Sequence, residues 1–351
     1  MTSAWKKRDV IRWGIIGCGD VTEIKSGPGF QKADGSQLVA VMRRTAGLAE
    51  DYARRHGVPK WYADADALIR DPEVDAVYVA TPPGTHCEYA LKVCAAGRPA
   101  YVEKPMARNA TECERMVKAF AAARLPLFVA YYRRAQPRFL KPKELIDAGA
   151  LGRVTGVCYH FADSRHQSVK ADDLPWRLNA EHAGGGFIFD LGSHTLDILD
   201  FMLGPLVDVE GSAANLASPY DVEDVVAMSF RTAAGVPGVA SWNFASVVRE
   251  DMIQITGTDG RVALSTFGAE PVRLETADGV REFDLPYPPH VAQPLIQAVV
   301  NELRGCGSCP STGETALRTA RVMDRVLEAY YGGRSDAFWL RPETWPGRRR
   351  Y

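Results

Sequence analysis

Three ionisable residues, Asp190, His194 and Asp197, stand at spacings of four and three in a stretch that is otherwise apolar. At about 100° per residue in an α-helix, these spacings put the three side chains on one face. An imidazole titrates near neutral pH and can take a proton from an alcohol, while a carboxylate one turn away can orient the ring. The pattern therefore predicts proton transfer, with His194 as general acid/base beside Asp190. Asp197 fits a site role or a buried structural bond equally well.

A second reactive group, the ammonium of Lys104, lies in Glu103-Lys104-Pro105 directly after a short apolar run. An ammonium at the carboxyl end of a parallel strand can hold a substrate hydroxyl and stabilise charge that develops on its oxygen. The alternative is a surface lysine that happens to precede a proline. We predict a catalytic Lys104, and the sequence leaves the isomer of the Lys104-Pro105 bond open.

A dinucleotide site is predicted near the start of the chain, where an apolar run from 11 to 16 leads into a glycine turn. The predicted phosphate loop consists of consecutive residues, Gly17, Cys18, Gly19, Asp20 and Val21. Gly17 can make the tight turn, and Gly19 lets the backbone approach a pyrophosphate. The match has two departures, since Thr22 stands at the usual third small position and Gly27 falls inside the expected first helix.

The end of the second expected strand decides which dinucleotide is preferred. An NAD site usually places Asp or Glu there to bond the ribose 2′-hydroxyl. This chain offers Arg43, Arg44 and Thr45 instead, two cations and a hydroxyl that suit a 2′-phosphate. We predict NADP in preference to NAD, with Arg44 as the main contact and Thr45 assisting. The alternative is an exposed basic turn with dual specificity.

The elements that position these residues follow from hydrophobic spacing. From 11 to 130, short runs that are apolar on both faces alternate with amphipathic helical stretches, which indicates a doubly wound parallel sheet. Five strands are expected, at 11–16, 37–42, 76–79, 100–102 and 127–129. Three helices are expected between them, at 46–56, 86–96 and 110–122.

The pattern changes after about residue 134, where strands dominate. Seven strands are expected, at 153–161, 208–216, 225–232, 236–244, 252–256, 261–265 and 272–276. Four helices accompany them, at 137–148, 187–202, 291–304 and 313–331. The expected fold is therefore α/β, with a parallel-sheet domain over 1–132 and an α+β domain with an open, mainly antiparallel sheet over 133–351.

Composition narrows the class of protein. The 351 residues are 46% hydrophobic and 24% charged with a net charge of −1, so no overall field favours nucleic acid or a membrane surface. No apolar run approaches the roughly 20 residues that span a bilayer. The basic first eight residues precede a strand and not a signal-peptide core, so a cytoplasmic location is expected. No metal site is expected, because His194 and its carboxylates resemble proton-transfer groups.

Taken together, the motifs resemble those of the glucose–fructose oxidoreductase / inositol dehydrogenase / rhizopine-catabolism (Gfo/Idh/MocA) family, over essentially the whole chain. The resemblance rests on motifs in a fixed order: Gly17-Cys18-Gly19, then 80–86 (Ala-Thr-Pro-Pro-Gly-Thr-His), then 102–105 (Val-Glu-Lys-Pro), then 184–186 (Gly-Gly-Gly) and 190–194 (Asp-Leu-Gly-Ser-His) with Asp197.

The resemblance implies a Rossmann domain, a Lys-Asp-His catalytic site, and a homodimer or homotetramer built through the second sheet. It also implies hydride transfer between NAD(P) and a secondary alcohol or carbonyl of a small polyhydroxylated substrate: a sugar, keto-sugar, anhydro-sugar or cyclitol. Glu103 would support the site on the cofactor side. Two alternatives stay open, a cyclic-diol (dihydrodiol-type) dehydrogenase and a non-catalytic regulator that senses NADP.

Secondary candidates follow from position. The segment that follows the expected strand at 76–79 should lie near the nicotinamide ribose, through Thr81, Pro82, Pro83 and His86. His86 fits a helix start equally well. Trp176 and Arg177 match a family segment near both ligands, although loop packing also explains the pair. Tyr132 replaces an asparagine common in relatives. The residues expected to touch substrate are Lys104, Tyr132, Arg177, Asp190, His194 and Asp197.

Overall fold

The computed structural model describes residues 5–348, which fall into two compact units. The first unit combines the described residues up to Ala107 with Glu112–Gln136 and Pro288–Leu317, and the remaining residues form the second. The units are thus interleaved along the chain, whereas the expected division at 132/133 is a single cut. The division into a nucleotide domain over 1–132 and a substrate domain over 133–351 stays a prediction.

The first unit is built on a parallel sheet of six strands in the order β3-β2-β1-β4-β5-β6. The strands are β1 (Ile11–Ile16), β2 (Ser36–Met42), β3 (Lys60–Tyr62), β4 (Ala76–Val79), β5 (Ala100–Val102) and β6 (Leu127–Val129). Every residue of β4, β5 and β6 is buried, as expected for strands covered on both faces. The doubly wound parallel sheet is confirmed. Its order reverses between β1 and β4, the position at which such sheets bind ligands.

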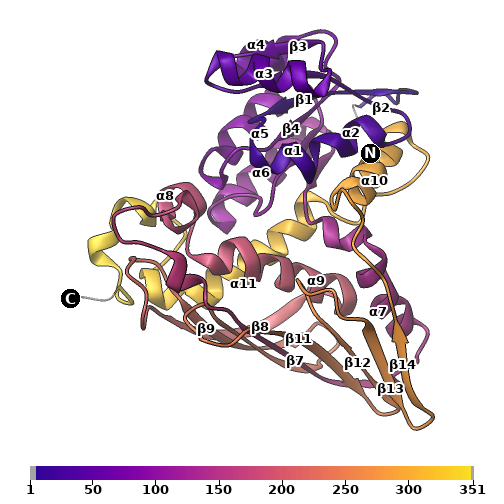
Figure 1. Cartoon of the computed structure of the whole chain (residues 1–351), viewed down its shortest axis with the longest axis vertical. Coiled ribbons are helices and arrows are strands. Elements are labelled where there is room, and N and C mark those ends of the chain that lie inside the picture. Colours follow the sequence, from indigo (N-terminus) through magenta and orange to yellow (C-terminus); the bar gives the residue numbers. More distant parts are fainter. Residues whose placement is uncertain (1–4, 349–351) are drawn as a thin grey trace. The chain divides into compact units, whose positions relative to one another are not determined.

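Seven helices accompany this sheet in the described residues: α1 (Asp20–Ile24), α2 (Gly27–Lys32), α3 (Ala46–His56), α4 (Ala65–Arg70), α5 (His86–Ala95), α6 (Ala110–Ala123) and α10 (Gln293–Arg304). The first expected helix is in fact two, because the chain breaks after α1 and restarts with Pro28 in the first turn of α2. From late in the sequence, α10 returns to lie beside α2 (Figure 1). Its buried Leu295, Val299 and Leu303 join the core around Trp13.

The second unit contains a sheet of eight strands in the order β14-β13-β12-β11-β7-β10-β9-β8. The strands are β7 (Val154–Ala162), β8 (Leu206–Ala214), β9 (Val225–Thr232), β10 (Pro237–Asn243), β11 (Glu250–Gly257), β12 (Gly260–Leu264), β13 (Val272–Thr276) and β14 (Gly279–Phe283). In the described sheet, β7 and β10 pair in parallel and the other neighbours pair antiparallel. The mainly antiparallel architecture is confirmed.

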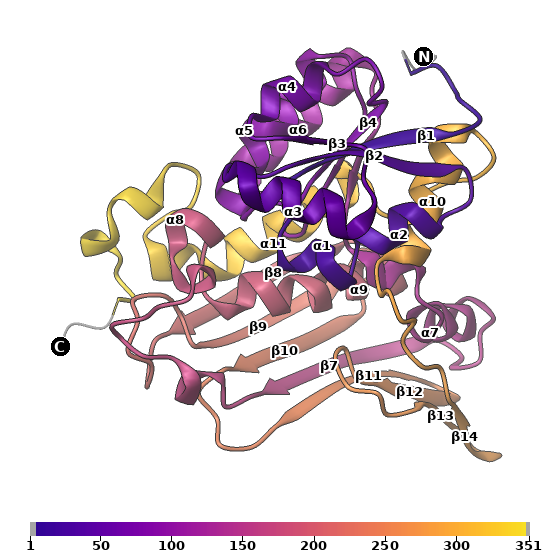
Figure 2. The same cartoon turned by 45° about the horizontal axis from the view of Figure 1, so that its top comes forward.

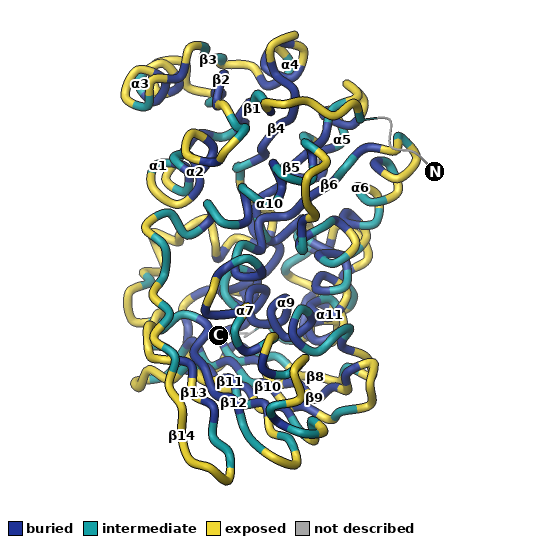
Figure 3. The backbone as a smooth tube through the Cα atoms, turned by 90° about the vertical axis from the view of Figure 1, so that its right-hand side faces the viewer, coloured by how far each residue is buried: buried dark blue, intermediate teal, exposed yellow. Residues whose placement is uncertain are grey.

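One face of the second sheet is covered by helices (Figure 2). These are α7 (Pro137–Asp147), α9 (Ser193–Leu203) and α11 (Gly313–Tyr331). A short helix, α8 (Ala180–Ala183), lies in the segment that precedes α9. Along β9, buried Met228 and Phe230 alternate with exposed Ser229 and Arg231, so the opposite face is open to solvent (Figure 3). Within residues 5–348, no helix has both the length and the apolar character that a membrane span requires.

Candidate active site

The glycine turn after β1 is held against the loop that follows β4. Gly17 has a φ of +91°, and a Cβ on it would lie 2.7 Å from Thr81 Cγ2, so both backbone and space require glycine. The N–H groups of Gly17 and Cys18 donate to the carbonyl oxygen of Met42 at 2.9 and 3.1 Å. A Cβ on Gly19 would meet only Gly17 O, at 3.9 Å. The side of the turn at Gly19 is therefore open to a ligand's phosphates.

The two departures from the usual glycine motif have a common explanation. Thr22 is buried, and its Oγ1 donates to Gly19 O at 2.7 Å, which closes the turn. Tyr52 donates its hydroxyl to Thr22 O at 2.8 Å. A Cβ on Gly27 would lie 2.1 Å from that same oxygen. Gly27, at the break between α1 and α2, therefore allows the close backbone contact with Thr22 that a side chain would block.

A charged network ties α1 to α3 beside this turn. Glu23 accepts from Arg55 Nη2 at 2.7 Å through Oε1, and His56 Nε2 lies 2.7 Å from its Oε2. Hydrogen bonds from Arg55, together with His56, lower the pKa of Glu23 to about 2. The network fixes the orientation of the two helices next to the predicted phosphate loop.

A Glu23→Gln variant tests that network. Because the carboxyl pKa is lowered in the folded chain, its contribution is present above the usual 4.5 and is lost as pH falls towards 2. We expect the variant to lose about 1 kcal/mol of unfolding free energy at pH 7, allowing for solvent screening of a partly exposed pair. In urea unfolding the two proteins should converge as the pH falls from 4.5 towards about 2. A difference that stays constant across this range would contradict the assignment.

The turn after β2 exposes the groups predicted to select NADP. Arg44 and Thr45 are exposed and Arg43 is half-buried, and among residues 5–348 neither arginine forms an ion pair with a carboxylate. Burial raises the pKa of the Cys18 thiol to about 11, an effect that the nearby charge of Arg43 partly opposes. Arg43 therefore lies near the phosphate loop, and no carboxylate in the described part of the chain pairs with the cations at this turn.

The loop after β4 is joined to the Lys104-Pro105 loop through a buried histidine. His86 begins α5 and is fully buried, with Nε2 2.6 Å from Thr81 O and Nδ1 3.1 Å from Pro105 O. Burial lowers its pKa, although both carbonyl contacts oppose this effect. Its position fits a residue that holds two loops together better than one that touches a ligand. Pro82 is exposed, and Pro83 is buried in the short turn that precedes α5.

Glu103 fixes the backbone at the predicted catalytic lysine. It lies directly after β5 with its carboxyl group buried, accepting from Tyr78 Oη at 2.5 Å and from Lys104 N–H at 3.0 Å. Burial raises the pKa of Glu103, while Tyr78 and the charge of Lys104 act in the opposite direction. The Lys104-Pro105 bond is cis, and the Lys104 side chain is half-buried. Lys104, Gly17 and Thr81 all follow the carboxyl ends of strands of one sheet.

In the second unit, two glycines of the triplet pass close to other backbone segments, and the third, Gly185, lies against the Phe189 side chain. Gly184 has a φ of +89°, and a Cβ on it would lie 2.8 Å from the backbone of Arg108. A Cβ on Gly186 would lie 2.5 Å from Glu223 O, and its N–H donates to Glu223 Oε1 at 2.8 Å. Tyr331 donates its hydroxyl to the same buried carboxyl group. The triplet thus leads into the predicted catalytic helix along a path that side chains would block.

The expected helix over 187–202 is not uniform. Residues Ile188–Gly192 form a π-turn, and α9 follows from Ser193 to Leu203. Asp190 lies in the π-turn, so the α-helical spacing used to place it on one face with His194 does not apply there. His194 and Asp197 lie in α9 and are buried, whereas the side chain of Asp190 is 30% exposed.

The structure brings Asp190 together with the Trp176-Arg177 pair. Arg177 Nε lies 3.4 Å from Asp190 Oδ2, and its guanidinium lies 4.5 Å from the centre of the Trp176 ring. Trp176 and Arg177 are both exposed. A cation, an aromatic face and a carboxylate are thus presented at one surface of the second unit, a combination suited to a polyhydroxylated ligand. Tyr132 instead packs against the core of the first unit.

Comparison with known proteins identifies the class of protein. Residues 11–131 match the model of an oxidoreductase family with an NAD-binding Rossmann fold, and residues 139–263 match the GFO/IDH/MocA C-terminal domain. The chain belongs to the GFO/IDH/MocA oxidoreductase family. This GFO/IDH/MocA protein is therefore an oxidoreductase with a domain that binds a nicotinamide dinucleotide.

Two curated relatives and one solved structure illustrate its similarity. "Oxidoreductase P35" of Formosa agariphila is 35% identical, over 90% of this chain and 97% of its own. 1,5-Anhydro-D-fructose reductase of Ensifer adhaerens is 28% identical, over 92% of this chain and 97% of its own. A levoglucosan dehydrogenase in complex with NADH and levoglucosan shares the fold, with a TM-score of 0.81 and 22% identity over 91% of this chain and 96% of that one.

Sequence reasoning missed two residues that shape the site of this GFO/IDH/MocA chain. The first is Tyr78, whose hydroxyl group orients Glu103. A tyrosine hydroxyl in an otherwise apolar, buried strand needs a hydrogen-bond partner, and this was the sequence feature that could have indicated its role. Phe267 lies with its ring centre 6.2 Å from that of His194. Asp251 accepts a hydrogen bond from the N–H of Phe267 at 2.6 Å, a contact that no sequence pattern predicts.

No group of three or more metal-binding side chains occurs within residues 5–348.

Proposed function

We propose that this cytoplasmic enzyme uses NADP to transfer hydride to or from a secondary alcohol or carbonyl of a sugar, keto-sugar or cyclitol. The observation that carries the proposal is the geometry of Lys104. Its backbone N–H is fixed by a buried carboxylate, at the same sheet edge as the open glycine turn. The name of the anhydrofructose reductase supports the substrate class.

The residues present fit a dinucleotide, because Gly17 makes the tight turn and Gly19 leaves its side of the turn free. A nicotinamide bound at this edge would supply the acceptor or donor of hydride. We assign to His194 the removal of the hydroxyl proton during oxidation and its return during reduction. Lys104 holds the reacting oxygen and stabilises the negative charge that develops on it. Asp190, paired with Arg177, aligns a neighbouring hydroxyl.

The reaction itself is tested by following absorbance of the reduced nicotinamide with a panel of pyranoses, keto-sugars, 1,5-anhydro-D-fructose and inositols, in both directions and with both cofactors. Turnover of a polyol or keto-sugar supports the proposal. Turnover restricted to an apolar cyclic diol would favour the dihydrodiol-type alternative, and no turnover with any compound would remove the proposed substrate class.

The preference for NADP rests on Arg43 and Arg44, whose charges no carboxylate in residues 5–348 pairs with, and on the hydroxyl of Thr45 beside them. In an Arg44→Ala variant we expect KM for NADPH to rise about 10- to 100-fold, because a charge-assisted hydrogen bond to the 2′-phosphate is lost. KM for NADH should change less than about twofold. Arg54→Ala is the matched control, since Arg54 is exposed on α3 and already paired with Asp51. Equal changes for the two cofactors would refute the preference.

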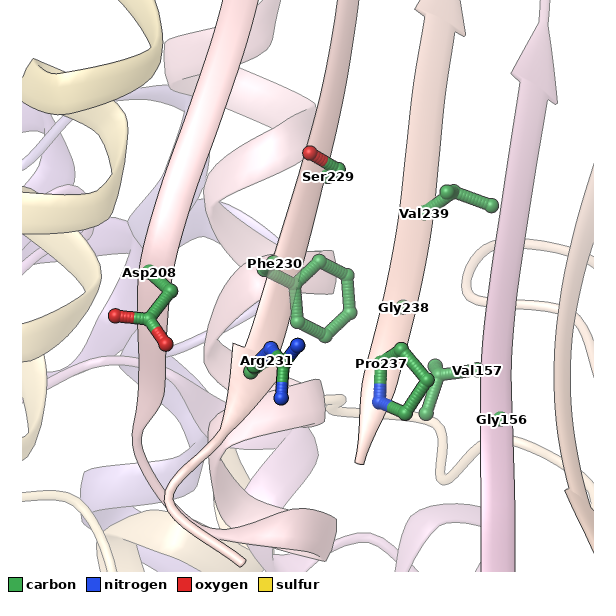
Figure 4. Close-up of a pocket in the computed structure, with 9 residues that line it drawn as sticks. All are labelled: Gly156, Val157, Asp208, Ser229, Phe230, Arg231, Pro237, Gly238 and Val239. Atoms are coloured by element: carbon green, nitrogen blue, oxygen red, sulfur yellow. The ribbon is translucent and has the colours of Figure 1, made fainter. Parts of the chain in front are cut away.

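We also propose that the open face of the second sheet joins copies of the chain into a dimer or tetramer. This face mixes small and apolar side chains with charged ones: Val239 is 53% and Met252 41% exposed, and Arg231 is exposed on the same face. Two depressions of about 390 and 660 Å³ are lined by residues of β7 to β10 and by none of the predicted site residues. Figure 4 shows the residues that line the first of them. Both depressions therefore fit protein contact better than catalysis. A monomer mass in analytical ultracentrifugation would exclude this assembly.

A further inference from the structure

A charged side chain outside the predicted catalytic groups is buried in the second unit. Arg334 follows α11 and is 3% exposed. Its Nε donates to Asp324 Oδ1 at 2.8 Å, and its guanidinium lies 4.1 Å from the Phe338 ring centre and 4.6 Å from that of Phe189. A buried guanidinium is costly unless its charge and donors are matched, and here a carboxylate and aromatic faces surround it.

The carbonyl groups that Arg334 holds are the informative feature. Its Nη2 donates to Arg108 O and to Gly184 O, each at 2.8 Å. Arg108 is four residues after Lys104, and Gly184 is six residues before Asp190. One guanidinium group thus holds the chain just beyond one predicted catalytic residue and just before another.

The segment at Arg108 is a short excursion of the chain. The chain leaves the first unit after Ala107 and re-enters it at Glu112. The residues between them, Arg108–Thr111, belong to the second unit. Asn109 Nδ2 donates to Arg334 O at 2.7 Å, and Ala110 N–H donates to Asp324 Oδ2 at 2.7 Å. The excursion is therefore tied to Arg334 and to its ion-pair partner.

Another contact fixes the same segment from outside. The guanidinium of Arg108 lies 3.6 Å from the Trp339 ring centre, and its Nη1 donates to Glu181 O at 3.2 Å. Trp345 Nε1 donates to Phe338 O at 2.9 Å, so the residues after α11 fold back on their own unit. The C-terminal tail therefore docks on this unit up to residue 348, and residues 349–351 lie outside the described part.

A second buried arginine provides a comparison. Arg138 is 1% exposed, donates to Leu285 O at 3.3 Å and to Glu270 O at 3.0 Å, and lies 4.7 Å from the Tyr287 ring centre. Its surroundings resemble those of Arg334, but neither carbonyl belongs to a segment next to a predicted catalytic residue. A buried arginine is therefore not unusual in this unit. What distinguishes Arg334 from Arg138 is that the carbonyl groups it binds belong to segments next to predicted catalytic residues.

We propose that Arg334, paired with Asp324, is a positioning residue for hydride transfer. It orders the segment after Lys104 and the glycine triplet before Asp190 and His194 as one structure. The inference rests on the proposed function, because it assigns a task to segments whose catalytic role is itself proposed.

Hydrogen exchange of the full chain tests the shared hold without any substrate. In Arg334→Met we expect faster exchange in peptides that cover 105–112 and 182–190 together, because both segments lose the same donor. In Arg138→Met, faster exchange should appear near 270 and 285 and not in those two segments. The inference is overturned if Arg334→Met loosens neither segment or only one, or if both variants loosen the same peptides.

Kinetics supply the second readout, with the panel compound that the unaltered enzyme turns over fastest. We expect Arg334→Met to lower the single-turnover rate about 10- to 100-fold while KM for NADPH stays within about twofold, because misplaced groups slow the reaction more than they weaken nucleotide binding. Arg334→Lys should recover little, since an ammonium lacks the planar fork. Arg138→Met should keep the full rate. An unchanged rate in Arg334→Met, or an equal loss in both variants, contradicts the proposal.

Two further variants separate the different failures. If no panel compound is turned over by the unaltered enzyme, the proposed function fails, and if Lys104→Met keeps full activity, the catalytic role of Lys104 fails. If Lys104→Met is inactive and Arg334→Met is fully active, the further inference alone fails. Should Arg334→Met not fold, Asn109→Ala leaves the ion pair intact and removes the bonds to Arg334 O and Asp336 O. It should loosen 105–112 and slow turnover several-fold, and a normal rate with normal exchange would contradict the proposal.

Discussion

Replacing Lys104 by Met is expected to lower kcat by about 10²- to 10³-fold, since the ammonium would no longer stabilise charge on the reacting oxygen. The dissociation constant for NADPH should change by less than about threefold, because the variant keeps the glycine turn and the basic residues after β2. The measurement is stopped-flow reduction or oxidation of the cofactor with saturating substrate, and nucleotide binding is followed separately by fluorescence.

Lys92→Met is the control for the Lys104 experiment. Lys92 belongs to the same unit, is 41% exposed and pairs with Glu88 and Asp66, so its loss should leave kcat unchanged. Full activity in Lys104→Met would remove Lys104 from the mechanism. A loss of nucleotide binding without a change in kcat would move it from catalysis to cofactor binding.

Replacing His194 by Gln is expected to lower kcat by about 10²- to 10⁴-fold, the usual range for loss of a general acid/base. The amide keeps a hydrogen-bonding group near the substrate but cannot exchange a proton. The pH dependence of the remaining rate should therefore flatten in the region where the unaltered enzyme's rate changes most steeply.

His182→Gln is the matched control for His194, because His182 is an exposed residue of α8 in the same unit. It should keep both the rate and the pH profile. A His194→Gln enzyme with an unchanged pH profile would show that another group moves the proton, whatever the size of the loss in kcat.

The sheets were predictable where burial shaped the sequence. The interior strands β1, β2, β4 and β5 and the buried edge strand β6 are short apolar runs, and each was predicted close to its observed bounds. The two missed strands are edges. β3 reads Lys-Trp-Tyr and pairs on one side only, and β14 is almost entirely exposed. An edge strand that is exposed to solvent on both faces has little hydrophobic alternation in its sequence, so it is difficult to predict.

The candidate site was predictable by residue type and less so by geometry. Periodicity indicated a helix over 187–202, but the π-turn at Ile188–Gly192 inserts backbone without changing that apolar pattern. The bond from Tyr78 to Glu103 joins residues 25 apart and needs the strand order β4-β5 to be known. Arg334 is more distant still, since its partners Arg108 and Gly184 are 226 and 150 residues away.

The position of α10 has a consequence for engineering chimeras. This helix comes from residues 293–304, yet Leu295, Ile296 and Val300 complete the core beneath Phe30. A truncated chain that ends at residue 132 would leave that hydrophobic surface uncovered. Grafting a foreign substrate module onto this enzyme at one junction would therefore fail, and a successful hybrid must retain Pro288–Leu317 from the same parent as the nucleotide-binding half.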